Sequence, residues 1–372
     1  MNWTRRKFLG AAACLPLPAT AASLPAAGEK PVECFRRIAV EEAFATPELL
    51  ADWRGLLAWA KDEDPAFFSL YSGLLTSGGA QGLRDRLSDV GRGRIGDMDR
   101  WNVDMQVLSL TAPGVQLFRP RKSAAVASEI NTRLAEIISE HPERYAGLAA
   151  IAPQDVSSAV RELDRAVKVL GLRGALINSH TQGEYLDNSR YWPIFEAAET
   201  LGVPIYLHPN TPSPQMAGPY MDYGLVGPGW GFAAETSLHA VRLILSGLLD
   251  AYPDTKIILG HMGEGLPFWL HRMDSRFGLF AKVDRTGRVK HLRKKPSEYV
   301  RDNFVITTSG MPWHPALMLS HQVLGVDRIM FAIDYPYEST KEAVLSMDKA
   351  PISSEDKKKI YSGNAERLFR LT

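Results

Sequence analysis

The sequence predicts an α/β protein in which eight strands and the helices between them form a (β/α)8 barrel, the TIM barrel. Short apolar runs alternate along the chain with longer segments in which apolar residues recur at helical spacing. Strands that alternate with helices form parallel sheets, and eight such units can close into a barrel. No linker or change in composition divides the chain, so we expect a single barrel over residues 33–372. The eight predicted strands cover residues 37–44, 104–111, 145–152, 171–178, 203–208, 256–261, 303–308 and 328–334.

The segments between these runs carry the pattern of amphipathic helices. In residues 157–170, "SSAVRELDRAVKVL", apolar side chains recur three or four positions apart, which places them on one face of a helix. Residues 191–202 and 237–252 show the same spacing. We expect these helices to cover the outside of the barrel.

Two connections, residues 45–94 and 209–235, are much longer than the others. They follow the first and the fifth predicted strand, and the second connection is rich in Pro and Gly. Long loops in a compact domain are usually functional, and the active sites of these barrels lie where such loops leave the strands. We expect both loops to form the walls of an aromatic-lined pocket. The aromatic residues of the first loop are Trp53, Trp59, Phe67, Phe68 and Tyr71.

The composition excludes a nucleic-acid-binding surface. The chain has 372 residues, 45% of them hydrophobic, with 43 Lys and Arg against 42 Asp and Glu, for a net charge of +1. Basic and acidic residues are evenly mixed, whereas nucleic-acid-binding proteins concentrate Lys and Arg on one face. The locally basic stretch 285–296 is interpreted as a solvated surface loop.

The N-terminus carries an export pattern. Arg5 and Arg6 precede a short Ala- and Leu-rich region, with small residues suited to cleavage near Ala21 or Ala27. This pattern is typical of a twin-arginine signal, so we expect residues 1–27 to be removed and the mature protein to be periplasmic. The apolar run is too short, and too interrupted by prolines, to span a bilayer, so no membrane segment is expected in the mature form.

The first predicted strand, "RIAVEEAF", ends in two adjacent carboxylates. Successive side chains of a strand point to opposite faces. We expect the bulky apolar face to pack against the outer helices and the face of small residues to point into the barrel. This assignment directs Glu41, and not Glu42, into the mouth of the barrel. The small-residue face carries Arg37, Ala39, Glu41 and Ala43, and the other carries Ile38, Val40, Glu42 and Phe44.

Three further predicted strands end in a polar residue, namely His208, His261 and Asp334. The carboxyl ends of barrel strands meet at one rim, so these side chains and Glu41 are expected to converge. Enclosing carboxylates costs several kcal/mol unless a cation neutralises them. We therefore expect one divalent metal held by Glu41, His208 and Asp334. Two carboxylates and one imidazole favour Mn²⁺, with Zn²⁺ as the alternative.

Five motifs, in this order, make the chain resemble the amidohydrolase superfamily, and within it the metal-dependent decarboxylases of hydroxylated benzoates. These relatives include the γ-resorcylate, 2,3-dihydroxybenzoate and 5-carboxyvanillate enzymes. Many members have Glu-x-His at the end of the first strand, where this chain has Glu41 and Ala43, as some decarboxylases of the branch do. The alanine removes one ligand and leaves a metal position for water or substrate. The motifs are "EEAFATPE", "LHPN", "LGHMGEGLPF", "IDYPYE" and "GNAERLF".

The resemblance implies non-oxidative decarboxylation of an aromatic acid with a hydroxyl group ortho to its carboxylate. Asp334 would deliver a proton to the ring carbon, and His261, paired with Glu264, would handle the phenolic proton or position the departing group. The alternative is hydrolysis of a lactone, amide or similar bond at the same site. Release of carbon dioxide from hydroxybenzoates distinguishes the two reactions.

Further residues are candidates for substrate binding. Arg272 matches a position that in relatives reaches the substrate or a neighbouring subunit's site, and Tyr337 matches a substrate-side position. Arg94 is a candidate for gripping a second carboxylate, and His180 follows the fourth predicted strand. The resemblance also implies a homodimer or homotetramer.

Overall fold

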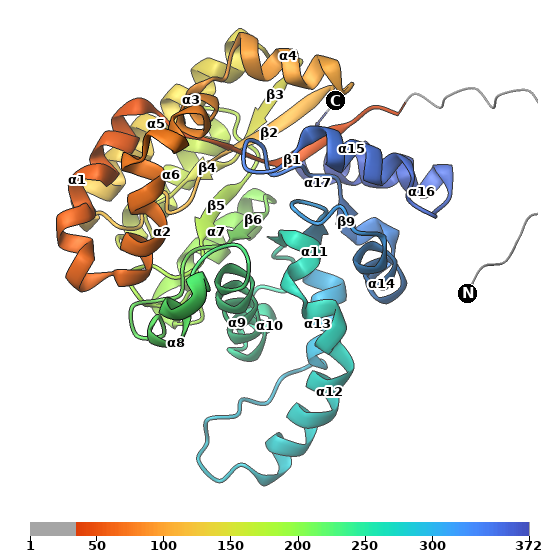
Figure 1. The fold of residues 1–372 in the computed structure, drawn as a ribbon. Coiled ribbons are helices and arrows are strands. Elements are labelled where there is room, and N and C mark those ends of the chain that lie inside the picture. Colours follow the sequence, from red (N-terminus) through yellow and green to blue (C-terminus); the bar gives the residue numbers. More distant parts are fainter. Residues whose placement is uncertain (1–34, 372) are drawn as a thin grey trace, which may run out of the picture. The chain divides into compact units, whose positions relative to one another are not determined.

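The computed structural model describes residues 35–371, in which nine short parallel strands follow one another around a ring in chain order (Figure 1). Each strand is hydrogen bonded to the next, except at one step between β3 and β4 and at the closure from β9 to β1. The strands are β1 (Ile38–Phe44), β2 (Met105–Leu110), β3 (Tyr145–Gly147), β4 (Ala149–Ala150), β5 (Ala175–Asn178), β6 (Ile205–His208), β7 (Ile257–Leu259), β8 (Phe304–Thr307) and β9 (Ile329–Met330).

β3 and β4 are two halves of one strand that changes partner at Leu148. The Leu148 N–H donates to the carbonyl of Leu108 in β2 at 2.9 Å, and the Ala149 N–H donates to the Gly174 carbonyl, next to β5, at 2.8 Å. The predicted strand 145–152 is therefore confirmed as one barrel position, and the ring has eight strands.

The ring closes between its first and last strands. The Val40 N–H donates to the Phe331 carbonyl at 3.2 Å, and the Ala43 N–H donates to the Tyr335 carbonyl at 2.8 Å. Both acceptors lie in the segment that follows β9, Phe331 close behind the strand and Tyr335 in the turn after Asp334. The predicted (β/α)8 barrel is confirmed.

The inside of the barrel is filled by side chains from all eight strands. Ala365 and Phe369 of α17 (Asn364–Phe369) pack against this set and cover one end of it. The interior residues are Ile38, Val40, Met105, Val107, Ala146, Leu148, Leu176, Tyr206, Ile258, Val305, Met330 and Ala332.

The predicted faces of the first strand are wrong for its first half. Ile38 and Val40 point inward, and Ala39 belongs to the core between the strands and the outer helices. The register with β2 shifts between Ala39 and Glu42, which marks a β-bulge. A bulge reverses the alternation of side chains, so Glu41 faces the interior despite the inverted start.

Helices surround the barrel, and the three predicted helical segments are helical. Residues 157–170 correspond to α6 and 191–202 to α7, whereas 237–252 contains the second half of α9 and all of α10, because α9 begins earlier, at Gly231. The helices are α1 (Pro47–Glu63), α2 (Pro65–Thr76), α3 (Gln81–Ser88), α4 (Arg92–Arg100), α5 (Pro120–Glu140), α6 (Val156–Lys168), α7 (Trp192–Leu201), α8 (Gly218–Met221), α9 (Gly231–Leu245), α10 (Leu248–Ala251), α11 (His261–Glu264), α12 (Leu266–Val283), α13 (Pro296–Asn303), α14 (His314–Leu324), α15 (Thr340–Asp348), α16 (Ser354–Lys358) and α17.

The first long connection is mostly helical, and three of its aromatic residues belong to the core instead of lining a pocket. Trp53, Phe67 and Tyr71 are 0%, 1% and 3% exposed, and Phe67 stacks on Tyr71. A capping residue begins each of its first two helices. The Thr46 side chain accepts from the Leu49 N–H at the start of α1, the Asp64 side chain accepts from the Phe67 N–H at the start of α2, and a Pro follows each cap. The prediction of an aromatic-lined wall is therefore wrong for these three residues.

α12 extends away from the barrel together with residues 284–295 (Figure 1). On the single chain, several large apolar side chains of this helix are exposed. They are Phe268, Trp269, Leu279, Phe280 and Val283.

In residues 35–371 no helix is both long enough and apolar enough to cross a membrane. The export signal predicted for residues 1–27 lies outside the described residues.

The position of Trp53 in the core generates a stability prediction. Trp53→Ala should lower the free energy of unfolding by about 3–5 kcal/mol, because it removes a buried indole whose Nε1 donates to the Gly114 carbonyl at 3.0 Å. Trp59→Ala, at a position that is 47% exposed, is the matched control and should change stability by less than about 0.5 kcal/mol. Urea unfolding of both variants checks this, and equal effects would contradict the assignment of Trp53 to the core.

Candidate active site

Glu41 is a buried carboxylate whose two oxygens have different surroundings. Its Oε2 accepts hydrogen bonds from the Tyr206 hydroxyl and, at 2.8 Å, from the Thr307 hydroxyl. Its Oε1 has no hydrogen-bond partner. That oxygen lies 3.5 Å from His208 Nε2 and 3.9 Å from His261 Nε2. One oxygen therefore anchors the side chain, and the other is directed at two imidazoles.

His208 closes β6, as predicted. Its Nδ1 donates to the Pro209 carbonyl at 2.9 Å, and a carbonyl can only accept. The proton is thereby fixed on Nδ1, which leaves the lone pair of Nε2 directed toward Glu41. This is the tautomer that a metal-binding imidazole requires.

His261 and Glu264 pair within a left-handed turn that follows β7. Residues His261 to Gly265 all have positive φ, between 49° and 78°. His261 Nδ1 lies 2.7 Å from Glu264 Oε1, and its backbone N–H donates to the Ser309 hydroxyl at 3.0 Å. A residue with a side chain costs about 1–2 kcal/mol in this conformation, so the surrounding contacts must hold the turn.

The surroundings of this pair shift its titration. Burial acts to lower the pKa of His261, but the carboxylates of Glu264 and Glu41 outweigh it and raise that pKa well above its ordinary value. Burial raises the pKa of Glu264, and the neighbouring imidazole partly opposes that rise. Each group of the pair thus favours the charged form of the other.

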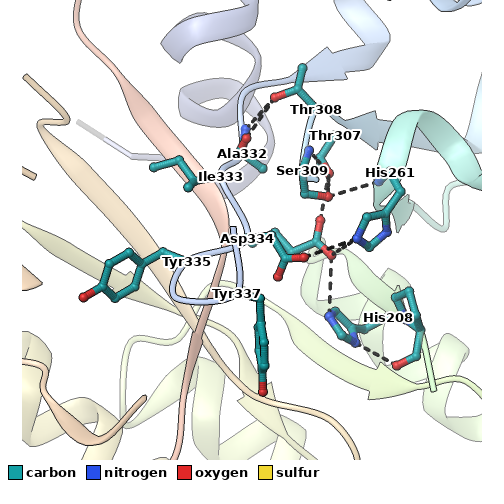
Figure 2. Close-up of polar contacts among 12 residues, drawn as sticks. His208, His261, Thr307, Thr308, Ser309, Ala332, Ile333, Asp334, Tyr335 and Tyr337 are labelled. Carbon is teal, nitrogen blue, oxygen red and sulfur yellow. Dashed lines mark hydrogen bonds and ion pairs between the residues drawn. The ribbon is translucent and has the colours of Figure 1, made fainter. Parts of the chain in front are cut away.

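Asp334 follows β9 and faces His261 (Figure 2). Its Oδ2 lies 3.4 Å from His261 Nε2, and its φ of 74° is left-handed. Tyr337 is placed by the same turn, because its N–H donates to the Asp334 carbonyl at 2.9 Å. The Tyr337 hydroxyl lies 2.7 Å from the Thr111 hydroxyl at the end of β2. Tyr337 therefore lies at the rim beside Asp334, where the resemblance placed it.

Glu41 and His208 lie close enough to share a divalent cation. Two ligands bonded at about 2.1 Å to one ion lie at most about 4.2 Å apart, and Glu41 Oε1 lies 3.5 Å from His208 Nε2. Asp334 reaches the same rim through His261, with 3.4 Å between Asp334 Oδ2 and His261 Nε2. Within residues 35–371 these groups approach in pairs, and no three of them make up a complete ligand cluster. Oε1 of Glu41 is buried without a hydrogen-bond partner beside the lone pair of His208 Nε2, and a cation bound there would neutralise its charge.

Gly260 makes room for this carboxylate. A Cβ at that position would lie 2.7 Å from Glu41 Oε1 and 3.1 Å from its carboxyl carbon. Real Cβ atoms do not approach so closely, and β1 fixes the backbone of Glu41. A side chain at residue 260 would therefore displace the carboxylate.

Two of the predicted substrate-binding residues have structural roles instead. Arg94 is fully buried, and its guanidinium donates to the carbonyls of Ala43 at 2.6 Å and Asp89 at 3.0 Å. His180 is 2% exposed, with Nε2 bonded to the Thr211 carbonyl and Nδ1 accepting from the Gly183 N–H. Burial lowers the pKa of His180 to about 4. Neither side chain has a free polar atom to offer a substrate.

Arg272 lies exposed on α12. Its contact with a substrate or a neighbouring subunit stays a prediction.

Three residues of the site were not identified from the sequence. Tyr206 lies two positions before His208 and therefore shares its face, a signal that the strand period could have revealed. Thr307 and Ser309 end the run "NFVITTS", whose hydroxyls gave a weaker signal of the same kind. Tyr206 and Thr307 orient Glu41, and Ser309 holds the backbone of His261.

Comparison with known proteins agrees with this geometry. A γ-resorcylate decarboxylase from Polaromonas sp. is 40% identical over 344 residues, which cover 90% of this chain and 98% of the relative. The crystal structure of 5-carboxyvanillate decarboxylase from Sphingomonas paucimobilis is 42% identical, covers 91% of this chain and 100% of its own, and superimposes with a TM-score of 0.85.

A second solved structure contains a metal. It is the 5-carboxyvanillate decarboxylase from Novosphingobium aromaticivorans with manganese and 4-hydroxy-3-methoxy-5-nitrobenzoic acid, 39% identical with a TM-score of 0.88, covering 91% of this chain and 96% of its own. The family model described as amidohydrolase matches residues 59–371. The chain belongs to the amidohydrolase family.

Proposed function

We propose that this protein is a metal-dependent decarboxylase of an aromatic carboxylic acid that carries a hydroxyl group ortho to the carboxylate. The observation that carries the proposal is the free oxygen of Glu41, which faces His208 while Asp334 faces His261 across the same rim. Relatives at about 40% identity that span nearly the whole chain are decarboxylases of hydroxylated benzoates, which supports it.

Glu41, His208 and Asp334 are the residues that would hold the metal, and the manganese bound in solved relatives supports Mn²⁺. When bound, such an ion would supply the positive charge that stabilises the phenolic and carboxylate oxygens of the substrate, and it would allow their chelation. Ala43 takes the place of a further ligand that many relatives have, which leaves room for this chelation.

Asp334 acts as the acid. It gives its proton to the ring carbon that carries the carboxylate, after which the bond from that carbon to the carboxylate breaks. The electron pair of the broken bond returns to the ring, aromaticity is restored and carbon dioxide leaves. His261 Nε2, at 3.4 Å from Asp334 Oδ2, can pass a proton to Asp334 for the next turnover, while Glu264 holds the ring of His261.

We also propose export and self-association. The twin arginine of residues 5 and 6 supports transport of the folded protein to the periplasm. The apolar side chains on α12 support a homo-oligomer, because single chains rarely expose a contiguous apolar face to water.

The role of Asp334 has a direct test. Asp334→Asn should abolish release of carbon dioxide from γ-resorcylate or 5-carboxyvanillate, because an amide cannot supply the proton. Asp327→Asn, at an exposed side chain, is the matched control and should keep full activity. Carbon dioxide is measured directly, with a panel of lactones assayed in parallel for new acid. An active Asp334→Asn protein of native thermal stability would disprove the assignment.

Gly260→Ala tests the metal ligand Glu41. The backbone of Gly260 has φ of −70°, which alanine adopts freely, so any effect must come from the clash between the new Cβ and Glu41. We expect Mn²⁺ affinity to fall by about 10–100-fold, the usual effect of misplacing a ligand through its neighbours. Titration calorimetry measures it. Gly55→Ala, whose Cβ would meet nothing within 4 Å, is the control. Equal Mn²⁺ affinities in the two variants would show that Glu41 is not a metal ligand.

The export proposal is tested by exchanging both signal arginines for lysine. Arg5→Lys combined with Arg6→Lys should leave the protein in the cytoplasmic fraction of a bacterium with a twin-arginine system, since that pathway reads the arginine pair. Lys7→Arg keeps the pair and should be exported normally. Detection of the double variant in the periplasm at the normal level would refute the proposal.

A further inference from the structure

We propose that Glu42 is a positioning residue that holds Asp334 in its working orientation, and that Arg94 keeps Glu42 in place. The proposal rests on the proposed function, in which Asp334 acts at the metal site. It gives the second carboxylate of "EEAF" a task distinct from that of Glu41.

The carboxylate of Glu42 accepts hydrogen bonds from the backbone amides on both sides of Asp334. One oxygen accepts from the Ile333 N–H at 2.9 Å, and the other accepts from the Tyr335 N–H at 3.2 Å. Ile333 and Tyr335 are the residues immediately before and after Asp334. Glu42 is fully buried, so water does not compete for these amides.

The residue between these two amides has a strained backbone. Asp334 has φ of 74°, a conformation that side-chain-bearing residues adopt only when their surroundings enforce it. On the near side of the segment the Thr308 hydroxyl bonds the Ala332 backbone at 3.0 Å (Figure 2). On the far side the Ala43 N–H donates to the Tyr335 carbonyl. Between these two attachments, Glu42 supplies the contacts that flank Asp334 itself.

Arg94 completes the arrangement. Its guanidinium lies 4.7 Å from the centroid of the Tyr335 ring, and it donates to the carbonyl of Ala43, the residue after Glu42. Burial raises the pKa of the Glu42 carboxyl, and the nearby positive charge of Arg94 opposes that rise. A buried carboxylate needs such a counter-charge, and a buried guanidinium needs these acceptors. Arg94 thus contacts β1 and the Asp334 segment at once.

The first test measures the hydrogen bonds of Glu42 to the two flanking amides, without metal or substrate. Glu42→Gln keeps the volume of the side chain but turns one acceptor into a donor, so one of the two flanking amides loses its partner. We expect hydrogen exchange of the amides of Ile333 and Tyr335 to rise by about tenfold in metal-free protein, the effect of losing one net hydrogen bond. Glu162→Gln, which changes a part-buried carboxylate on α6, is the control and should leave this exchange unchanged.

The second test asks whether Glu42 acts through Asp334. Mn²⁺ affinity is measured for Glu42→Gln, for Asp334→Asn and for the double variant. Glu42→Gln should weaken Mn²⁺ binding by about 10-fold in the wild-type background and leave it unchanged in the Asp334→Asn background, since coupled residues do not contribute additively. In the proposed reaction, Glu42→Gln should lower kcat more than it raises KM.

The outcomes separate this proposal from the proposed function. Unchanged exchange at Ile333 and Tyr335, or equal weakening of Mn²⁺ binding in both backgrounds, would overturn the role of Glu42. Failure of every hydroxybenzoate to release carbon dioxide would overturn the function alone, because the exchange experiment needs no substrate. If Glu42→Gln does not fold, Glu42→Asp keeps the charge but is too short to reach both amides. Its exchange decides the question in the same way.

Discussion

The rim of this barrel depends on one buried carboxylate, Glu41, of which only one oxygen has hydrogen-bond partners. Glu41 comes from β1, and its Oε2 is bonded to hydroxyls from β6 and β8, so three strands fix a single side chain. The remaining oxygen lies beside the free nitrogen of His208, where an unpaired negative charge would cost several kcal/mol. A cation offsets that cost. The barrel thus stabilises a site that is complete only when it is loaded.

The groups proposed to carry the chemistry lie on strained backbone just beyond the strands. His261 and Glu264 lie in a left-handed turn, and Asp334 has a left-handed φ, whereas Glu41 and His208 belong to strands. Strain of this kind persists where neighbouring contacts enforce it. The side chains on strands are held rigidly, and the strained turns direct Asp334 and the His261–Glu264 pair at the same space from positions that a strand could not provide.

The sequence was sufficient for the strands and for their polar ends, because an apolar run that stops at His208 or Asp334 is a local pattern. It was insufficient for the faces of β1. The bulge between Ala39 and Glu42 depends on pairing with β2, so Ile38 was assigned outward although it points inward. Arg94 and His180 were misjudged for a related reason: their partners lie far away in the chain or on backbone that no motif reveals. The caps of α1 and α2, Thr46 and Asp64, are each followed by Pro in the sequence, yet the length of this connection predicts a loop.

Closure of the barrel and placement of Asp334 depend on neighbouring residues of β1. The hydrogen bonds that join β1 to the segment after β9 involve Val40 and Ala43, and the carboxylate of Glu42, between them, holds the amides on either side of Asp334. Successive side chains of a strand point to opposite sides, so the adjacent residues Glu41 and Glu42 serve different sites, with Glu41 directed inward and Glu42 bonded to the segment after the last strand. The contacts that join the first strand to the last segment therefore lie directly beside Asp334. The same pairing that closes the barrel thus fixes the backbone of the proposed proton donor, so closure of the ring and the geometry of the candidate catalytic site depend on the same few residues.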